Sequence, residues 1–382
     1  MKIFKNASLS TGLAMFSMFF GAGNITFPLI IGQTVEGGLL WALLGLILTA
    51  VLIPFSGLFS ITLFEGDYES FFSRIGKWPG FTVILLLICM IGPLGGIPRC
   101  ITLTFSTLKV YFSSIQLLTF SLLSCLTIFF CSWKKNRILD LIGYILSPLL
   151  LFFLVIIIVK GIFFSPSDTI AASSMPHPFF YGLKEGYNTM DLLASFFFSS
   201  LVYHKLKKRQ QGKTKGLLLA TFKASLIGAT LLSSIYIGFS YVAAYHSSSF
   251  EGVGVDQLLG KVGQVILGNQ GGLVVCMSIA LTCLTTAIAL TVISAEFLQN
   301  RVLRGRVSYE WSLILILLVT ILTSTLEFTG IVNLLAPVLR IIYPSLLILC
   351  LVNVFHKTFG YKPVKIPVFI TFSLVLYFQL IA

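Results

Sequence analysis

The chain has 382 residues, of which 57% are hydrophobic and only 10% are charged. A soluble domain carries about 25% charged residues, so this composition excludes a water-soluble globular protein. Lys and Arg outnumber Asp and Glu by 26 to 13, which gives a formal net charge of +13. The basic residues gather between long apolar runs, a pattern typical of a protein that crosses a membrane many times.

Apolar runs of the length that a helix needs to cross a bilayer, roughly 20 residues, recur along the whole chain. Their apolarity is continuous, without the alternation of barrel strands, which indicates helices. The sequence therefore predicts an all-α polytopic membrane protein with about eleven transmembrane helices, the third long enough to be tilted or bent. The expected ranges are 8–33, 38–64, 80–112, 115–132, 138–162, 185–203, 216–245, 270–297, 308–326, 329–355 and 367–382.

The basic residues are divided unevenly between the two sides of the membrane that these spans define. Nineteen of the 26 lie on one side and four on the other. The richer set includes Lys2, Lys5, Lys134, Lys135 and Arg137. Cytoplasmic connections are the ones enriched in Lys and Arg, so we expect the N-terminus to be cytoplasmic.

The first span carries residues that interrupt a helix. Gly21 and Gly23 permit non-helical backbone, and Pro28 lacks an N–H donor. We expect two half-helices, 8–20 and roughly 25–33, with exposed backbone at 21–24. In hydrocarbon, free N–H and C=O groups are tolerated only where they line a cavity or find partners. The structural alternative is a packing motif in which small residues let a neighbouring helix approach.

The sixth span begins with a polar segment, Glu185 to Asp191, before only about a dozen apolar residues. Gly, Asn, Thr and Asp are poor residues for a helix interior, so we expect a second interruption at membrane depth. An extracellular loop with a helix cap is the alternative.

We expect a single transmembrane domain (1–382) made of two halves of five spans each, 8–162 and 185–355, with an additional helix at 367–382. Each interruption lies in the first span of its half. Because each half has an odd number of spans, the second half crosses the membrane in the opposite orientation to the first. Broken helices at corresponding positions of two such inverted halves indicate the binding site of a secondary transporter.

Broken helices in these positions suit a zwitterionic ligand. Half-helix N-termini favour a carboxylate, and unwound carbonyls favour an ammonium group or a monovalent cation. Thr282, Thr285 and Thr286 in the eighth span offer oxygen atoms as ligands for sodium. The alternative is that their hydroxyl groups donate hydrogen bonds to main-chain carbonyls of their own helix.

Charges are costly within a span, and two of the charged residues that fall within predicted spans are candidates for a role at the site. Asp191 is a candidate for a helix cap, a cation ligand or a proton carrier. Arg99 is a candidate for the pathway, for pairing with a carboxylate, or for packing. An enzyme is not expected, because all four histidines fall in predicted connections and no converging catalytic set appears at membrane depth.

Four motifs, in order along nearly the whole chain, resemble the branched-chain amino acid:cation symporters. They are FFGAGNITFP (19–28), GPLGGIPR (92–99), EGYNTMD (185–191) and CLTT (283–286). The resemblance implies the five-plus-five inverted repeat of the LeuT-like fold, with discontinuous spans 1 and 6. It also implies sodium-coupled import of leucine, isoleucine and valine by alternating access across a bacterial inner membrane, with sodium as coupling ion and no other cofactor.

The resemblance also assigns residues to sites. The substrate carboxylate would contact Gly21, Ala22 and Gly23, next to Asn24. The amino group and aliphatic tail would contact Gly186, Tyr187, Asn188, Thr189 and Met190. Sodium would be held by Thr285 and Thr286 with carbonyls of Phe20 and Thr282, and Ser17 is an alternative to either carbonyl.

The chain departs from the family in two ways. The family usually has twelve spans where this sequence predicts eleven. The pair Gly95 and Gly96, together with Asn188, is smaller or more polar than expected at these motif positions. A proton-coupled or exchanging transporter of other neutral amino acids, such as methionine, is the competing expectation. The expected surroundings are the lipid bilayer, without nucleic acid, and the sequence leaves the oligomeric state open.

Overall fold

The computed structural model is a bundle of helices. The structure describes residues 7–35, 37–133, 147–163, 176–209, 216–250 and 252–381, and every regular element within these ranges is helical. The first part of the predicted span 138–162 lies outside the described residues. So do Lys2, Lys5, Lys134, Lys135 and Arg137.

In chain order, the helices are divided between an N-terminal and a C-terminal half. The N-terminal half contains α1 (Ala7–Phe19), α2 (Ala22–Thr34), α3 (Leu39–Ile47), the π-helical η2 (Leu48–Leu52), α4 (Ile53–Leu63), α5 (Tyr68–Ser73), α6 (Lys77–Ile91), α7 (Gly96–Lys109), α8 (Leu117–Ser132) and α10 (Ser147–Phe163). The C-terminal half contains α11 (Pro178–Asn188), α12 (Asp191–Arg209), α13 (Leu217–Tyr245), the 3₁₀ turn η6 (Ser247–Phe250), α14 (Leu258–Phe297), the π-helical η7 (Leu298–Val302), α15 (Tyr309–Ser324), α16 (Glu327–Phe359) and α17 (Lys365–Ile381).

Long apolar helices account for much of the bundle. Within the described ranges, the helices long and apolar enough to cross a membrane are Leu39–Leu63, Lys77–Lys109, Leu217–Tyr245, Val274–Val302 and Glu327–Phe359. Helices α1 and α2 pass the same test as one span that is bent by 71° at its break. The other apolar helices are shorter, so the count of eleven spans and the inverted repeat stay predictions.

Two further spans depart from a regular helix. The third span consists of α6 and α7 with a turn at 92–95, which agrees with the predicted bend. Helix α14 changes direction at Gly268, whose φ of 67° is a conformation that glycine adopts without steric conflict. The membrane-length part of α14 follows this bend, from Val274 onward.

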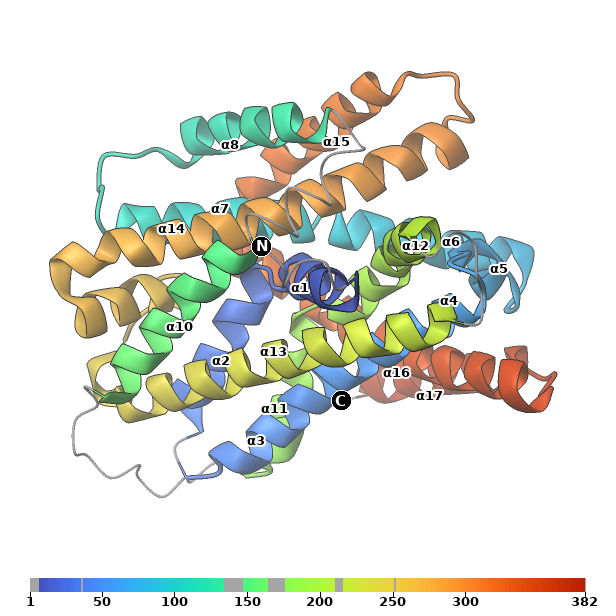
Figure 1. Ribbon diagram of the computed structural model, residues 1–382, viewed down its shortest axis with the longest axis horizontal. Coiled ribbons are helices and arrows are strands. Elements are labelled where there is room, and N and C mark those ends of the chain that lie inside the picture. Colours follow the sequence, from blue (N-terminus) through green and yellow to red (C-terminus); the bar gives the residue numbers. More distant parts are fainter. Residues whose placement is uncertain are drawn as a thin grey trace.

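The half-helices are packed inside the bundle rather than at its surface. Of the helices that flank the first break, α1 packs against α12 and α13, and α2 packs against α13 (Figure 1). Of those that flank the second break, α11 packs against α3, and α12 packs against α4. Helix α14 runs beside α7 across the molecule. Both helix breaks are therefore enclosed by other helices, which is where irregular backbone is tolerated in a membrane.

Several of the basic connections meet at one end of the bundle. The Arg74 guanidinium donates to Asn353 Oδ1 (2.9 Å) and to the Lys362 carbonyl (3.5 Å), and Arg301 forms an ion pair with Glu69. Helix α5 lies at this end, beside α6 and α12 (Figure 1). The contacts agree with a shared side for these connections, and the cytoplasmic orientation of that side stays a prediction.

Candidate functional site

The first break is shorter than the sequence predicts. Helix α1 ends at Phe19 and α2 begins at Ala22, so the expected unwinding of 21–24 is wrong for most of its length. The Gly21 N–H donates to Asn24 Oδ1 at 3.1 Å. A side-chain acceptor in the first turn stabilises a helix start by satisfying an otherwise free N–H group, which explains why α2 begins early.

The second break is also confined to two residues, Thr189 and Met190. The interruption predicted in the polar segment 185–191 is therefore present but short, because Glu185 to Asn188 complete a helix that begins upstream at Pro178. Met190 has a φ of 63°, an uncommon left-handed conformation for a residue with a side chain. Thr189 Oγ1 donates to the Gly186 carbonyl at 2.8 Å and so satisfies one of the last carbonyls of α11.

The two breaks face each other. A Cβ atom added at Gly23 would lie 3.1 Å from the Thr189 Cα, so the two backbones are in direct contact. The small cavity beside them has a volume of about 30 Å³, which leaves room for no more than a few water molecules. It is lined by Met18, Phe19, Gly21, Ala22, Gly23, Asn24, Ile91, Gly96, Arg99, Cys100, Thr189, Met190, Asp191, Ala194, Phe198, Thr286 and Leu290.

This lining divides the predicted substrate residues. The structure brings together Gly21, Ala22, Gly23, Asn24, Thr189 and Met190 around the cavity. The apolar residues from α6, α12 and α14 were missed, since nothing distinguishes them in the sequence from other apolar residues of the same spans.

Three predicted substrate residues lie away from the cavity. Gly186 packs against α3 and η2, where an added Cβ would lie 1.8 Å from Thr49 Oγ1. The Tyr187 ring lies against Tyr343 with centroids 4.4 Å apart, and the Asn188 side chain donates to Glu185 (3.2 Å). These positions are helical, so their side chains point around α11 instead of lining the break.

Asp191 is buried at the first turn of α12 and links the two breaks. Its carboxylate accepts from Asn24 Nδ2 (2.5 Å) and from the Tyr236 hydroxyl (3.2 Å), and Asn24 also contacts that hydroxyl. Because Asn24 caps α2 through Gly21, the network ties the start of one half-helix to the start of the other.

Arg99 is buried in α7 on another side of the same cavity, with 2% of its surface exposed. Its Nη1 donates to the Asn188 carbonyl at 2.9 Å, at the C-terminal end of α11. The guanidinium carbon lies 5.3 Å and 5.4 Å from the ring centroids of Phe27 and Phe328, a distance at which cation–π attraction is favourable.

A cluster of buried oxygen atoms lies directly beside the first break, between α1 and α14. Thr286 Oγ1 is 3.1 Å from the Phe20 carbonyl, and Thr285 Oγ1 is 3.4 Å from the Ser17 carbonyl and 3.5 Å from Ser17 Oγ. Thr285 also donates within its own helix to the Thr282 carbonyl at 2.9 Å. We call Ser17, Phe20, Thr282, Thr285 and Thr286 the oxygen cluster. All the residues predicted for sodium are in it, together with the alternative, Ser17.

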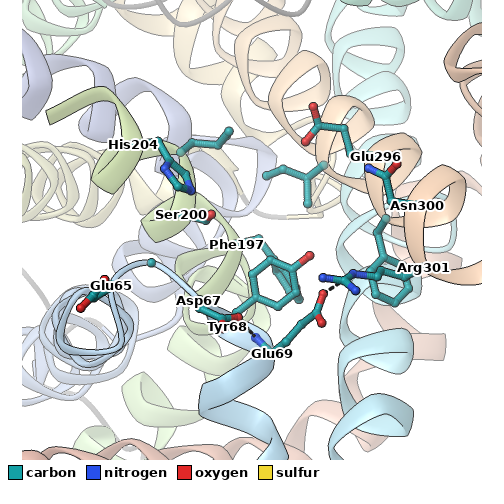
Figure 2. A pocket seen from close by; sticks show the side chains of 14 residues that line it. Glu65, Asp67, Tyr68, Glu69, Phe197, Ser200, His204, Glu296, Asn300 and Arg301 are labelled. Atoms are coloured by element: carbon teal, nitrogen blue, oxygen red, sulfur yellow. Dashed lines mark hydrogen bonds and ion pairs between the residues drawn. The ribbon is translucent and has the colours of Figure 1, made fainter. Parts of the chain in front are cut away.

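A larger pocket of about 500 Å³ opens at the end of the bundle that carries the basic connections. Phe197 and Ile293 line it, while Phe198 and Leu290, close to them on the same two helices, line the central cavity. Figure 2 shows Glu69 and Arg301 pointing toward each other in this pocket, beside Tyr68. The pocket and the central cavity are therefore lined by neighbouring residues of α12 and α14.

Two broken helices that meet inside an all-helical membrane bundle define a transporter of the LeuT-like fold. Solved structures agree. The substrate-bound outward-open state of a Na⁺-coupled sialic acid symporter superimposes with a TM-score of 0.66 at 13% identity, over 97% of this chain and 88% of that one. MhsT in complex with L-phenylalanine gives a TM-score of 0.58 at 15% identity, over 95% of this chain and 98% of that one.

The sequence comparison identifies the family. Residues 4–380 match the family described as branched-chain amino acid transport protein, and the chain belongs to it. The branched-chain amino acid permease BraB of Bacillus subtilis (strain 168) is 29% identical over 359 residues, which cover 91% of this chain and 80% of the permease. The protein is a multi-pass membrane transporter of this family and not an enzyme.

Proposed function

We propose that the protein imports leucine, isoleucine and valine by sodium-coupled symport with alternating access. The family match and the BraB permease support the substrate class. The Na⁺-coupled sialic acid symporter, which has the same fold, supports the coupling ion. The observation that carries the proposal is the oxygen cluster, where two threonine hydroxyls of α14 face main-chain carbonyls at the end of α1.

The oxygen cluster has the composition that sodium requires. Sodium is a hard monovalent cation, and carbonyl and hydroxyl oxygens replace its hydration shell without adding a full negative charge to the membrane interior. An ion bound there would hold the last turn of α1 against α14. Since Phe20 is in the cluster and the next residue, Gly21, lines the cavity, ion binding would order the substrate-binding backbone. Each sodium that enters with the substrate adds about 2.3 kcal/mol of driving force per 100 mV of membrane potential.

The closed cavity supports alternating access. A volume of about 30 Å³ holds no more than a few water molecules and is too small for an amino acid such as leucine. The aromatic rings of Phe19 and Phe198, with centroids 5.3 Å apart, line the cavity. Movement of α1 or α12 that separates these rings would enlarge the cavity.

The sodium site is tested by a pair of threonine variants. Thr286→Ala removes a hydroxyl of the oxygen cluster, so we expect the sodium concentration for half-maximal leucine uptake to rise about tenfold or more. Thr282→Ala is the matched control. The Thr282 hydroxyl donates to the Ser278 carbonyl (2.7 Å) and is not part of the oxygen cluster, whereas the Thr282 main-chain carbonyl, which is part of it, remains in the variant. Uptake of labelled leucine into proteoliposomes is measured at fixed pH, with choline replacing sodium.

Two outcomes would contradict sodium coupling at this site. One is equal sodium dependence in Thr286→Ala and the wild type, and the other is leucine uptake that continues undiminished in choline. The second result would favour the competing candidate, proton coupling through Asp191, whose buried carboxylate bonded to Asn24 and Tyr236 is the observation in its favour. Competition by methionine and other neutral amino acids in the same assay defines the substrate range.

A further inference from the structure

One edge of the Arg99 guanidinium carries hydrogen-bond donors without acceptors. Nη1 donates to the Asn188 carbonyl, but within the part of the chain that the structure describes Nε and Nη2 are buried and have no hydrogen-bond partner. A buried, charged donor group without an acceptor is strongly unfavourable. Nε and Nη2 form one side of the planar guanidinium, the side that binds both oxygens of a carboxylate at once.

This free edge lies at the start of α2. A Cβ added at Gly23 would be 3.3 Å from Nη2, so Nη2 lies close to the first turn of α2. First-turn N–H groups of a helix have no acceptor within the helix, and the helix dipole there favours an anion. Arg99 and the helix start therefore present positive potential to the same side of the cavity, which both line.

Protein carboxylates do not occupy this edge. Asp191 and Glu185 are close enough to act electrostatically on Arg99, yet among the described residues neither forms an ion pair with it. Asp191 accepts hydrogen bonds from Asn24 and Tyr236, and Glu185 accepts one from Asn188. The rings of Phe27 and Phe328 lie against the guanidinium group and so help to hold it in place.

We propose that the Nε–Nη2 edge of Arg99 binds the α-carboxylate of the transported amino acid, together with the first-turn N–H groups of α2. Arg99 is then the residue that makes the site selective for ligands with a carboxylate. Asp191, which lines the same cavity, supplies negative charge that favours the ammonium end of the zwitterion. The proposal rests on amino acid transport at this same site and adds the group that recognises the carboxylate.

The test compares leucine with leucinamide, which keeps the ammonium group and the aliphatic side chain but replaces the carboxylate with a neutral amide. Purified protein is titrated with each compound, and affinity is read from the ligand-induced rise in melting temperature. We expect the wild type to prefer leucine about 100-fold or more. In Arg99→Lys and Arg99→Gln the preference should fall below about tenfold, because leucine affinity decreases while leucinamide affinity changes little.

Arg74→Gln is the matched control. Arg74 is another arginine that donates to a buried acceptor, the side-chain amide oxygen of Asn353, but it lies at the end of the bundle and outside the cavity lining. This variant should keep the wild-type preference for leucine. Arg99→Lys retains the charge and the aliphatic stem, so it tests the carboxylate site even if Arg99→Gln does not fold.

The outcomes separate this proposal from the proposed function. If both Arg99 variants keep the preference, or lose affinity for leucine and leucinamide equally, Arg99 is structural and the carboxylate site is wrong while leucine transport stands. If the wild type neither imports leucine nor is stabilised by it, the proposed function fails and the carboxylate site fails with it.

Discussion

At the scale of single residues, the glycines of the first break are needed for close approach rather than for unusual backbone angles. Gly21 has an extended conformation (φ −115°, ψ −163°), which any residue can adopt. An added Cβ would instead meet Thr286, with Cγ2 at 3.0 Å and Oγ1 at 3.2 Å. At Gly23 it would meet the Thr189 backbone and the Arg99 guanidinium. The two glycines therefore contact different sites: one the oxygen cluster, the other the second break.

This difference predicts separable effects of two alanine variants. Gly21→Ala should displace Thr286 and raise the sodium concentration for half-maximal uptake about tenfold at saturating leucine. Gly23→Ala should raise the KM for leucine by a similar factor at saturating sodium, since overpacking of this kind costs about 1–3 kcal/mol. Uptake kinetics over a grid of sodium and leucine concentrations measure both. Equal changes in both constants for both variants would show that the glycines do not distinguish the sites.

At the scale of helices, the second break is held by an irregular turn in another span. The π-helical turn η2 leaves a main-chain carbonyl of Thr49 available to the Tyr343 hydroxyl, which donates to it at 3.0 Å. The same hydroxyl accepts from the Leu192 N–H at 3.3 Å, in the first turn of α12. One tyrosine of α16 thus connects the π turn to the start of the half-helix that follows the break.

Tyr343→Phe should consequently destabilise the protein by about 1–3 kcal/mol, because it leaves a buried carbonyl and a buried N–H unsatisfied. Tyr187→Phe is the control: its ring lies against Tyr343, but no hydrogen bond of its hydroxyl occurs within the described residues. Chemical unfolding in detergent compares the two variants with the wild type. Equal stability of Tyr343→Phe and the wild type would mean that η2 does not support the break through this hydroxyl.

At the scale of the whole molecule, the structure is closed at the breaks and open at one end. The pocket of about 500 Å³ lies among α5, α12 and η7, and the Glu69–Arg301 ion pair crosses it (Figure 2). Burial raises the pKa of Glu69 above its ordinary 4.5, and the charge of Arg301 opposes this shift only in part. The ion pair thus does not fully offset the desolvation of the carboxylate.

The sign of this shift gives a pH prediction. A carboxyl whose folded pKa is raised contributes stability that is complete below its unfolded pKa and is lost as pH rises through the folded pKa. Glu69→Gln mimics the protonated form, so it should be more stable than the wild type at pH 8, and the difference should vanish toward pH 4. Melting temperatures across this range test it. A variant that is less stable than the wild type at pH 8 would show that the ion pair outweighs the burial.

The sequence by itself determined the membrane class and the existence of both breaks. Long apolar runs, the glycines near Gly21 and the polar segment before Asp191 are local signals, and local backbone energetics act wherever the helix lies. The threonines of α14 were found for the same reason, since Thr285 and Thr286 are conspicuous polar residues in an apolar span.

Only the tertiary structure decided which side chains meet at the site. Gly186 and Tyr187 belong to the polar segment that predicts the second break, and only the packed structure shows that they are helical residues of α11 that turn away from the cavity. The sequence also could not show that Ser17 faces Thr285, or that one edge of Arg99 is free beside Gly23. These relations join residues far apart in the chain, and they exist only once the helices are packed.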